Sequence, residues 1–418
     1  MSRELRSIWL WFLGAHVAVV ALGFLLWSQP MGDVYNVYEP WSNQALGGGD
    51  IVGITAAWVY PQVALVPMLA AHLFSWIAGY TFGWAVLVCV LDAAAFAFLV
   101  GRGRSRARMT GARVWLVLFV LLGPIGMYRI DAITVPLAIV ALLLAIRHPA
   151  VSSAILTIGA WIKIWPAAVV LALTIAARKR WWVVVASAGA TAAAVVLVVV
   201  ALGGAENLTG FITAQVGRGL QMESTAATPF VWLAVFGING AKVAFDNEII
   251  TFAVYGPGVD TMAALLTPLM AVAVAAVCVV GVLKARAGAR MLRLLPPLTL
   301  TLVLVLIVFN KVGSPQFVAW IIAPFVLWVI VDRRGIRRGL QYAAITAFLT
   351  QGVYPLVFDL VRVANPIGVL VLTARNVMLV VLLVWVVRQL LRVPTERTRV
   401  AHIAASGPRR ADAPPVLD

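Results

Sequence analysis

Long apolar stretches separated by short clusters of Arg and Lys dominate this sequence. Apolar residues make up 63% of the chain and charged residues 11%, and the mean hydropathy is +0.99. Since a soluble domain carries roughly 25% charged residues, this chain lacks the polar side chains needed to cover a water-facing surface. We therefore expect an all-α, polytopic integral membrane protein, and not the soluble multidomain protein that 418 residues suggest by length alone.

The basic residues indicate how the chain is oriented. The formal net charge is +16, from 32 Lys+Arg and 16 Asp+Glu. A nucleic-acid-binding protein gathers such charge on one folded face, whereas here most of it lies between apolar stretches, as in cytoplasmic loops of membrane proteins. We therefore expect membrane lipids as partners and no nucleic acid. The basic residues outside these clusters are Arg129, Lys163, Arg218, Lys242, Lys311, Arg362 and Arg375.

The apolar stretch at 8–28 predicts a first span, which is retained because no small-residue cleavage site follows it. Two apolar helices, 58–78 and 81–100, then precede the Arg cluster at 102–113. Only one of them crosses if both Arg3 and that cluster are cytoplasmic. Residues 58–78 contain two prolines and follow a polar loop, so we expect an interfacial or re-entrant helix on the outer face.

Four of the following apolar stretches are shorter than the roughly 20 residues that a normal span needs. Their charged hairpin tips predict a water-filled cavity that opens outward, because lipid does not tolerate such tips. These short stretches are 114–127, 132–146, 150–161 and 165–177. The later spans are expected at 181–202, 260–282, 294–309, 315–330, 340–358 and 366–387, with an outer loop at 203–258.

This pattern predicts about twelve crossings with both termini in the cytoplasm. Residues 1–392 are expected to form one transmembrane domain. Residues 393–418 are rich in Pro, Arg, Ala and Asp and show no apolar periodicity, so we expect a disordered cytoplasmic tail.

Candidate functional residues lie in the outer loops. Asp33 follows the first span by five residues, where a carboxylate can act as a general base toward a hydroxyl at the interface. The alternative is an ordinary interfacial loop with an aromatic belt. Arg129, Asp131 and Lys163 lie at membrane depth, where ionisable residues are functional by default. Arg129 and Asp131 alternatively neutralise each other and brace their hairpin.

Three further basic residues are candidates for binding a phosphate. Arg218 lies between glycines in residues 217–224, and Lys311 lies in the polar turn 310–317. An arginine flanked by glycines can approach an oxyanion closely. The alternative interpretation of the residues around Arg218 is a helix cap with a solvated charge pair. Arg375 lies deep in the last span, where it faces either a lipid-borne phosphate or a carboxylate, Asp92 or Asp359.

Metal and nucleotide chemistry have no support in the sequence. The four histidines are scattered, and no acidic pair of the DxD kind is present to hold a divalent cation. Cys89 and Cys278 lie in apolar stretches, which offers neither a disulfide framework nor a thiolate site. We therefore expect no metal and no cofactor.

The ordered outer motifs resemble those of the GT-C superfamily of membrane glycosyltransferases, and most closely glycosyltransferase family 87, over most of residues 8–388. The motifs are Gly32-Asp33 through Tyr38, Tyr60-Pro61, Gly123-Pro124 with Arg129-x-Asp131, Lys163-Ile164-Trp165-Pro166, Arg218-Gly219-Leu220-Gln221-Met222-Glu223-Ser224 and Ser314-Pro315-Gln316-Phe317. Tyr35 stands at the second position after Asp33 in place of another acid, so metal-dependent relatives with an acidic pair are poor guides.

The resemblance implies a mannosyltransferase that uses polyprenyl-phosphate-mannose, with a phosphatidylinositol mannoside or lipoglycan as the glycolipid acceptor. It implies that Asp33 is the general base of an inverting transfer on the outer face of the plasma membrane. Lys311, Arg218 and Arg375 are then candidates for binding the donor phosphate. The residues implied to line the sugar and acceptor site are Arg129, Asp131, Lys163, Glu223, Gln316 and Tyr38.

Three alternatives stay open. The same mechanism can act on another lipid-linked sugar, such as arabinofuranose or glucose. A transporter or flippase of lipid-linked sugars is a second reading, although such proteins usually show internal repeats and none is visible here. A membrane scaffold is a third reading, which the polar hairpin tips argue against.

Overall fold

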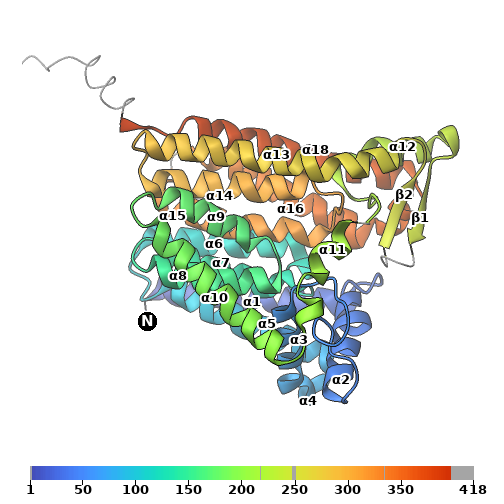
Figure 1. Ribbon diagram of the computed structural model, residues 1–418, viewed down its shortest axis with the longest axis horizontal. Coiled ribbons are helices and arrows are strands. Elements are labelled where there is room, and N and C mark those ends of the chain that lie inside the picture. The colour runs from blue at the N-terminus through green and yellow to red at the C-terminus, as the bar shows by residue number, and fades with distance from the viewer. Residues whose placement is uncertain (1, 217, 247–250, 334, 397–418) are drawn as a thin grey trace, which may run out of the picture.

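The computed structural model describes residues 2–216, 218–246, 251–333 and 335–396, and Figure 1 shows a bundle of helices aligned along the long axis. Within the described residues, 7 helices are long and apolar enough to cross a membrane. They are α1 (Arg3–Leu25), α5 (Tyr80–Val100), α6 with its 3-10 continuation η4 (Arg106–Gly126), α10 (Trp181–Ala201), α13 (Val259–Arg286), α14 (Met291–Val308) and α18 (Pro366–Leu391). The prediction of a helical membrane protein is thereby confirmed.

Shorter apolar helices complete the bundle. These are α7 (Asp131–Leu144), α8 (Pro149–Ile162), α9 (Pro166–Ala176), η8 (Pro315–Ile321) with α15 (Ile322–Val331), and α16 (Arg337–Gln351) with η9 (Gly352–Leu356) and α17 (Phe358–Arg362). Helices α8 and α9 begin with a proline, which fits the first turn because its missing N–H has no partner there. Helix α8 ends at Ile162 and α9 begins at Pro166, and the turn between these two short helices carries the polar residue Lys163.

The clusters of basic residues meet at one end of the bundle, which we call the basic end. There the Lys284 ammonium donates to the carbonyl of Val393 at 3.1 Å, and Arg178 donates to the carbonyl of Ala285 at 3.5 Å. The N-terminus and the end of α18 also lie at this end (Figure 1). Asp33, Arg129 and Lys311 lie at the opposite end, which we call the site end.

The loop after α1 stays at the site end. It forms a π-helical turn η1 (Val34–Tyr38), α2 (Glu39–Leu46), η2 (Gln62–Ala64), α3 (Leu65–Ala71), η3 (His72–Phe74) and α4 (Ser75–Ala78). In Figure 1, α2, α3 and α4 lie together at the lower right, beside the start of α5. The Tyr80 hydroxyl donates to the Met68 carbonyl at 2.8 Å, while Leu73 and Trp76 are exposed. This apolar segment therefore packs across the bundle end and adds no long helix.

The structure corrects three details of the sequence-based predictions. Helix α6 begins at Arg106, because the Ser105 hydroxyl caps it, so with η4 it spans 21 residues and is not short. Residues 203–258 include an antiparallel hairpin of β1 (Lys242–Asp246) and β2 (Thr251–Tyr255), so the fold is not wholly helical. The same region contains η5 (Ala205–Asn207), α11 (Gly210–Val216), η6 (Thr225–Ala227), α12 (Thr228–Val235) and η7 (Ile238–Gly240).

The third correction concerns the predicted tail at 393–418. Val393 is buried, and the Glu396 amide donates to the Ala287 carbonyl at 3.0 Å, so the chain stays packed on the bundle for a few residues past α18. Residues 397–418 of the predicted tail lie outside the described part of the chain.

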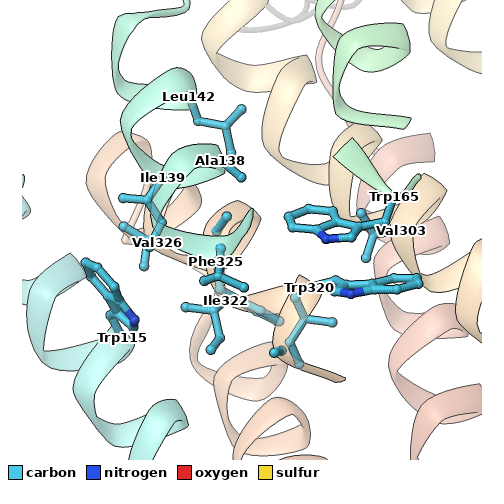
Figure 2. Close-up of a cluster of buried hydrophobic side chains, with 14 of the residues drawn as sticks. Trp115, Ala138, Ile139, Leu142, Trp165, Val303, Trp320, Ile322, Phe325 and Val326 are labelled. Atoms are coloured by element: carbon cyan, nitrogen blue, oxygen red, sulfur yellow. The ribbon is translucent and has the colours of Figure 1, made fainter. Parts of the chain in front are cut away.

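Large aromatic and branched side chains fill the centre of the bundle. Helix α14 is the most enclosed of the long helices: 78% of the residues in its apolar 18-residue stretch are buried, whereas only 11% are buried in the corresponding stretches of α10 and α13. Figure 2 shows Trp115, Trp165, Trp320 and Phe325 in the core, where the facing helices meet. A helix that is apolar on all sides but exposed along its length suits contact with lipid. Helices α10 and α13 therefore form the outer faces of the bundle.

Candidate active site

Asp33 and Arg129 form an ion pair at the site end. The Arg129 Nε lies 3.3 Å from Oδ2 of Asp33, and the side chains are 6% and 35% exposed, respectively. Burial opposes the charged form of Arg129, but the charge of Asp33 outweighs it and raises the pKa of the guanidinium. The arginine thus stays cationic, and it holds a carboxylate that is still open to solvent on one side.

The backbone around Asp33 is fixed from two sides. Arg129 also donates to the carbonyl of Pro30 at 3.0 Å, which ties the segment just before Asp33. The Tyr38 hydroxyl accepts a hydrogen bond from the amide of Ile130 at 3.1 Å, and its fully buried ring packs on Trp84. Burial raises the pKa of Tyr38 well above its ordinary value, so this phenol stays neutral. Tyr38 therefore anchors the Asp33 loop to the turn before α7.

Asp131 is buried and forms no ion pair with Arg129. Its Oδ1 accepts a hydrogen bond from the Trp320 indole at 2.5 Å, while its Oδ2 has no hydrogen-bond partner among the described residues. Trp320 stacks on Trp165 with ring centroids 5.8 Å apart and an interplanar angle of 12° (Figure 2). The alternative in which Arg129 and Asp131 neutralise each other is wrong, because α1 and its loop bring Asp33 to the arginine instead.

Tyr60 lies among the charged groups. The Lys163 ammonium stands 4.4 Å from the centre of the Tyr60 ring and 5.7 Å from that of Phe317. Burial raises the pKa of Tyr60; the Lys163 charge opposes this rise, and the Asp33 and Asp131 charges add to it. Two carboxylates and an ammonium thus act on one phenol. Cation–π contact with two rings holds the Lys163 head at the polar tip between α8 and α9.

Gln221 joins two loops that are far apart in the sequence. The backbone N–H of Gln221 donates to the Lys311 carbonyl at 3.0 Å, and its side-chain oxygen accepts from the backbone N–H of Gly313 at 2.9 Å. The Ser224 hydroxyl donates to the Asn310 carbonyl at 2.7 Å. A Cβ on Gly313 would lie 2.2 Å from the Glu223 carbonyl carbon, so only glycine permits this approach. The turns around 221–224 and 310–313 therefore form one unit.

This unit places two cations near each other. Burial lowers the pKa of Lys311, and the Arg218 charge lowers it further. Burial also lowers the pKa of Arg218, although Asp246 and the Tyr60 phenol oppose this. A nearby like charge disfavours the protonated form of a lysine, and an anion bound between the two cations favours it again. Lys311 and Arg218 thus form a cationic pair that suits a phosphate.

Glu223, in the turn at 221–224, and Arg375, in α18, are both nearly fully buried. Arg375 donates to the backbone carbonyl of Glu223 at 3.0 Å, and Gln221 donates to the Glu223 carboxyl at 3.3 Å. Burial raises the pKa of Glu223 to about 7, although the charges of Arg375 and Arg129 oppose the rise. Arg375 therefore supports the loop from below, and Glu223 titrates near neutral pH.

The two carboxylates expected as alternative partners of Arg375 are paired elsewhere. Asp92 lies 3.1 Å from Nε2 of His16, where both residues are buried between α1 and α5, and Asp359 pairs with Arg362 at 2.7 Å. The alternative in which Arg375 pairs with Asp92 or Asp359 is wrong, because α18 packs against the loop that carries Glu223.

The candidate residues thus fall into two groups. Asp33, Tyr38, Asp131 and Lys163 lie around Tyr60, with Arg129 bound to Asp33. Lys311, Arg218 and Glu223 lie in or next to the turns that Gln221 joins, and Arg375 contacts Glu223 from α18. Gln316 is buried in the short helix that also carries Phe317 and Trp320.

Sequence reasoning missed Gln221 and Trp320 as bridging residues. Gln221 lies within the motif at 218–224, but only its contacts show that it joins this motif to the turn at 310–313. No local signal distinguishes Trp320 from the other tryptophans.

Among the described residues, no three His, Cys, Asp or Glu side chains converge as a metal site would require. Comparison of the chain with protein-family models, with curated proteins and with solved structures returns no match. The fold and the site together define a helical membrane protein with a charged, aromatic-lined centre at one end of its bundle.

Proposed function

We propose that the protein is an inverting membrane glycosyltransferase that takes its sugar from a polyprenyl phosphate. The observation that carries the proposal is the environment of Tyr60. The Lys163 ammonium stands 4.4 Å from the centre of the Tyr60 ring, and the pKa of this phenol responds to the charge of Asp33. The pKa of Arg218 responds to Tyr60, and that of Lys311 responds to Arg218. A base and a phosphate-binding pair thus flank one polar centre, as a single displacement at a sugar phosphate requires.

Each group has a defined task in this reaction. Asp33 accepts the proton of the acceptor hydroxyl, whose oxygen forms a bond to the anomeric carbon of the donor sugar. The bond from that carbon to the phosphate oxygen breaks, and its electron pair leaves with the polyprenyl phosphate. Lys311 and Arg218 stabilise the growing negative charge, and Arg129 keeps the carboxylate of Asp33 in place. One displacement inverts the anomeric configuration.

The arrangement of the helices supports a lipid-borne donor. Helix α9 is only 11 residues long and packs between α10 and α13, the two long helices with the most exposed apolar faces. A polyprenyl chain along this side of the bundle meets apolar surface, while its phosphate meets the cations at the site end. Lys163, in the turn between α8 and α9, adds a further cation beside Tyr60 and Phe317.

The finer parts of the proposal follow the family resemblance and the charge pattern. The sugar is mannose and the acceptor is a glycolipid of the phosphatidylinositol mannoside or lipoglycan type. Arg129, Asp131, Lys163, Glu223, Gln316 and Tyr38 line or support the sugar and acceptor site. The chain has the GT-C architecture with about twelve crossings. Both termini are cytoplasmic, and the site end faces outward from the plasma membrane.

The direct test is sugar transfer by purified protein that carries Asp33→Asn. Mannose labelled in polyprenyl-phosphate-mannose is followed into a glycolipid acceptor, and we expect the rate to fall by a factor on the order of 100 or more. Asp50→Asn is the matched control, because Asp50 is an exposed carboxylate of the same loop that contacts Thr55. Transfer by the Asp33→Asn protein at the parent rate would show that Asp33 is not the base.

A transporter of lipid-linked sugars is the second candidate, and the buried His16–Asp92 pair favours it. Paired ionisable residues in the middle of spanning helices are typical of proton relays in transporters. Reconstituted liposomes separate the two proposals. Movement of an intact lipid-linked sugar between leaflets, without any glycosidic bond formed, supports transport and contradicts transfer.

A further inference from the structure

A cavity of 430 Å³ lies at the basic end, where α8 and α10 begin. Its wall contains Arg147 and His148 from the loop before α8, and Lys179 and Arg180 from the loop before α10. The proposed transfer reaction has no use for these residues, because the candidate active site lies at the other end of the bundle.

The cavity has positive charge without an internal counter-ion. Arg147, Lys179 and Arg180 are all exposed at its mouth, and neither Asp nor Glu is among the residues that line it. Within the described part of the chain, the structure records no side-chain hydrogen bond or ion pair for these three. By contrast, Arg293 at the same end is paired with Asp332. Three cations around one hollow repel each other until an anion joins them.

The two helix starts add to this preference for an anion. Pro149 begins the 14-residue helix α8, and Trp181 begins the 21-residue helix α10, and the first turn of each helix borders the cavity. Neither helix has a side-chain cap at its N-terminus. The first amides of a helix lack partners within it, and the helix dipole is positive at this end.

Trp181 and Trp182 indicate which kind of anion fits. Their side chains are 53% and 61% exposed at the start of α10, whose remaining length is apolar and faces outward. Exposed tryptophans at the end of such a helix mark the level of lipid headgroups. A lipid there places its phosphate at the cavity and its acyl chains along α10.

We propose that this cavity binds the phosphate headgroup of an anionic phospholipid from the leaflet at the basic end. The lipid is bound as a ligand of the protein and is not consumed. Arg147, Lys179 and Arg180 contact the phosphate, and the Trp182 indole covers its glycerol side.

Native mass spectrometry of the full chain tests the proposal. The protein is purified in neutral detergent and offered phosphatidylglycerol or phosphatidylcholine with identical acyl chains. We expect the parent to retain phosphatidylglycerol with at least tenfold higher affinity. The triple variant Arg147→Gln, Lys179→Gln, Arg180→Gln is expected to lose this preference. The control triple variant Arg102→Gln, Arg104→Gln, Arg106→Gln changes the net charge equally, affects exposed residues of the same end, and is expected to keep the preference.

Three results would overturn the proposal. One is equal retention of both lipids by the parent, and another is an equal loss in both triple variants, which indicates general charge attraction only. The third is displacement of the lipid by inorganic phosphate at the lipid's own concentration, which assigns the cavity to a soluble anion. If the first triple variant fails to fold, Lys179→Gln against Arg104→Gln provides the same comparison.

Discussion

The Nε of Arg129 lies 3.3 Å from Oδ2 of Asp33, and this contact joins the loop after the first helix to the turn before α7. The two residues are 96 positions apart in the sequence, as their numbers show. The same guanidinium holds the carbonyl of Pro30 and stands 5.4 Å from the centre of the Tyr354 ring. One buried cation thus fixes the position of the proposed base.

Removal of this cation is expected to disorder Asp33. Arg129→Gln leaves the carboxylate without its partner and the carbonyl of Pro30 without its donor. Because Asp33 is partly exposed, we expect a stability loss of only about 1 kcal/mol, together with a fall in the transfer rate of roughly tenfold or more. Arg362→Gln is the control, since it breaks the exposed pair with Asp359. Thermal unfolding and labelled-sugar transfer measure the two effects, and an equal response of both variants contradicts the role of Arg129.

Glu223 is expected to make stability depend on pH. Burial raises its pKa from 4.5 to about 7, so the folded protein favours the protonated carboxyl. Its stabilising contribution is complete below pH 4.5 and is lost as the pH rises through about 7. The melting temperature should therefore fall over this range in the parent and fall less in Glu223→Gln. Glu206→Gln, at an exposed glutamate, should follow the parent; identical curves for all three proteins would exclude Glu223 as the titrating group.

The close approach of Gly313 to Glu223 is expected to tolerate no side chain. In Gly313→Ala, the new Cβ meets backbone atoms at 2.2 Å, so the turns around 221–224 and 310–313 must separate. Loss of the hydrogen bond from the Gly313 amide to Gln221 adds about 1–3 kcal/mol to the destabilisation. In Gly219→Ala of the same loop, no atom lies within 4 Å of the added Cβ, so the stability should change little. Melting temperatures of the two variants check this contrast, and equal values contradict it.

The buried His16–Asp92 pair is expected to behave as a coupled unit. His16→Leu leaves the Asp92 carboxyl without its imidazole partner between α1 and α5, at a cost of about 3–5 kcal/mol. The double variant His16→Leu, Asp92→Leu removes both polar groups and should recover most of that stability. Unfolding of the single and double variants in detergent measures the coupling. Simple addition of the two single effects would show that the residues do not act together.

Local sequence determined the helices. Residues 81–100, 150–161 and 181–202 were expected to be helical, and α5, α8 and α10 confirm them with shifts of one residue. Each helix follows from apolar runs and from prolines at first turns, because its backbone hydrogen bonds close within the segment itself. Charge spacing also predicted that 58–78 is an interfacial or re-entrant helix that does not cross, and in the structure this segment consists of the short helices η2, α3, η3 and α4.

The tertiary structure decided which charged groups meet. Arg129 has an acid two positions away, Asp131, yet its partner is Asp33, and Arg375 contacts the Glu223 carbonyl in place of Asp92 or Asp359. Gln221 bridges two turns that share no pattern in the sequence. These choices depend on which helices pack together and on which groups packing removes from water. Hydropathy and charge order determine where each helix runs, but only the packed bundle determines the partner of a buried charge.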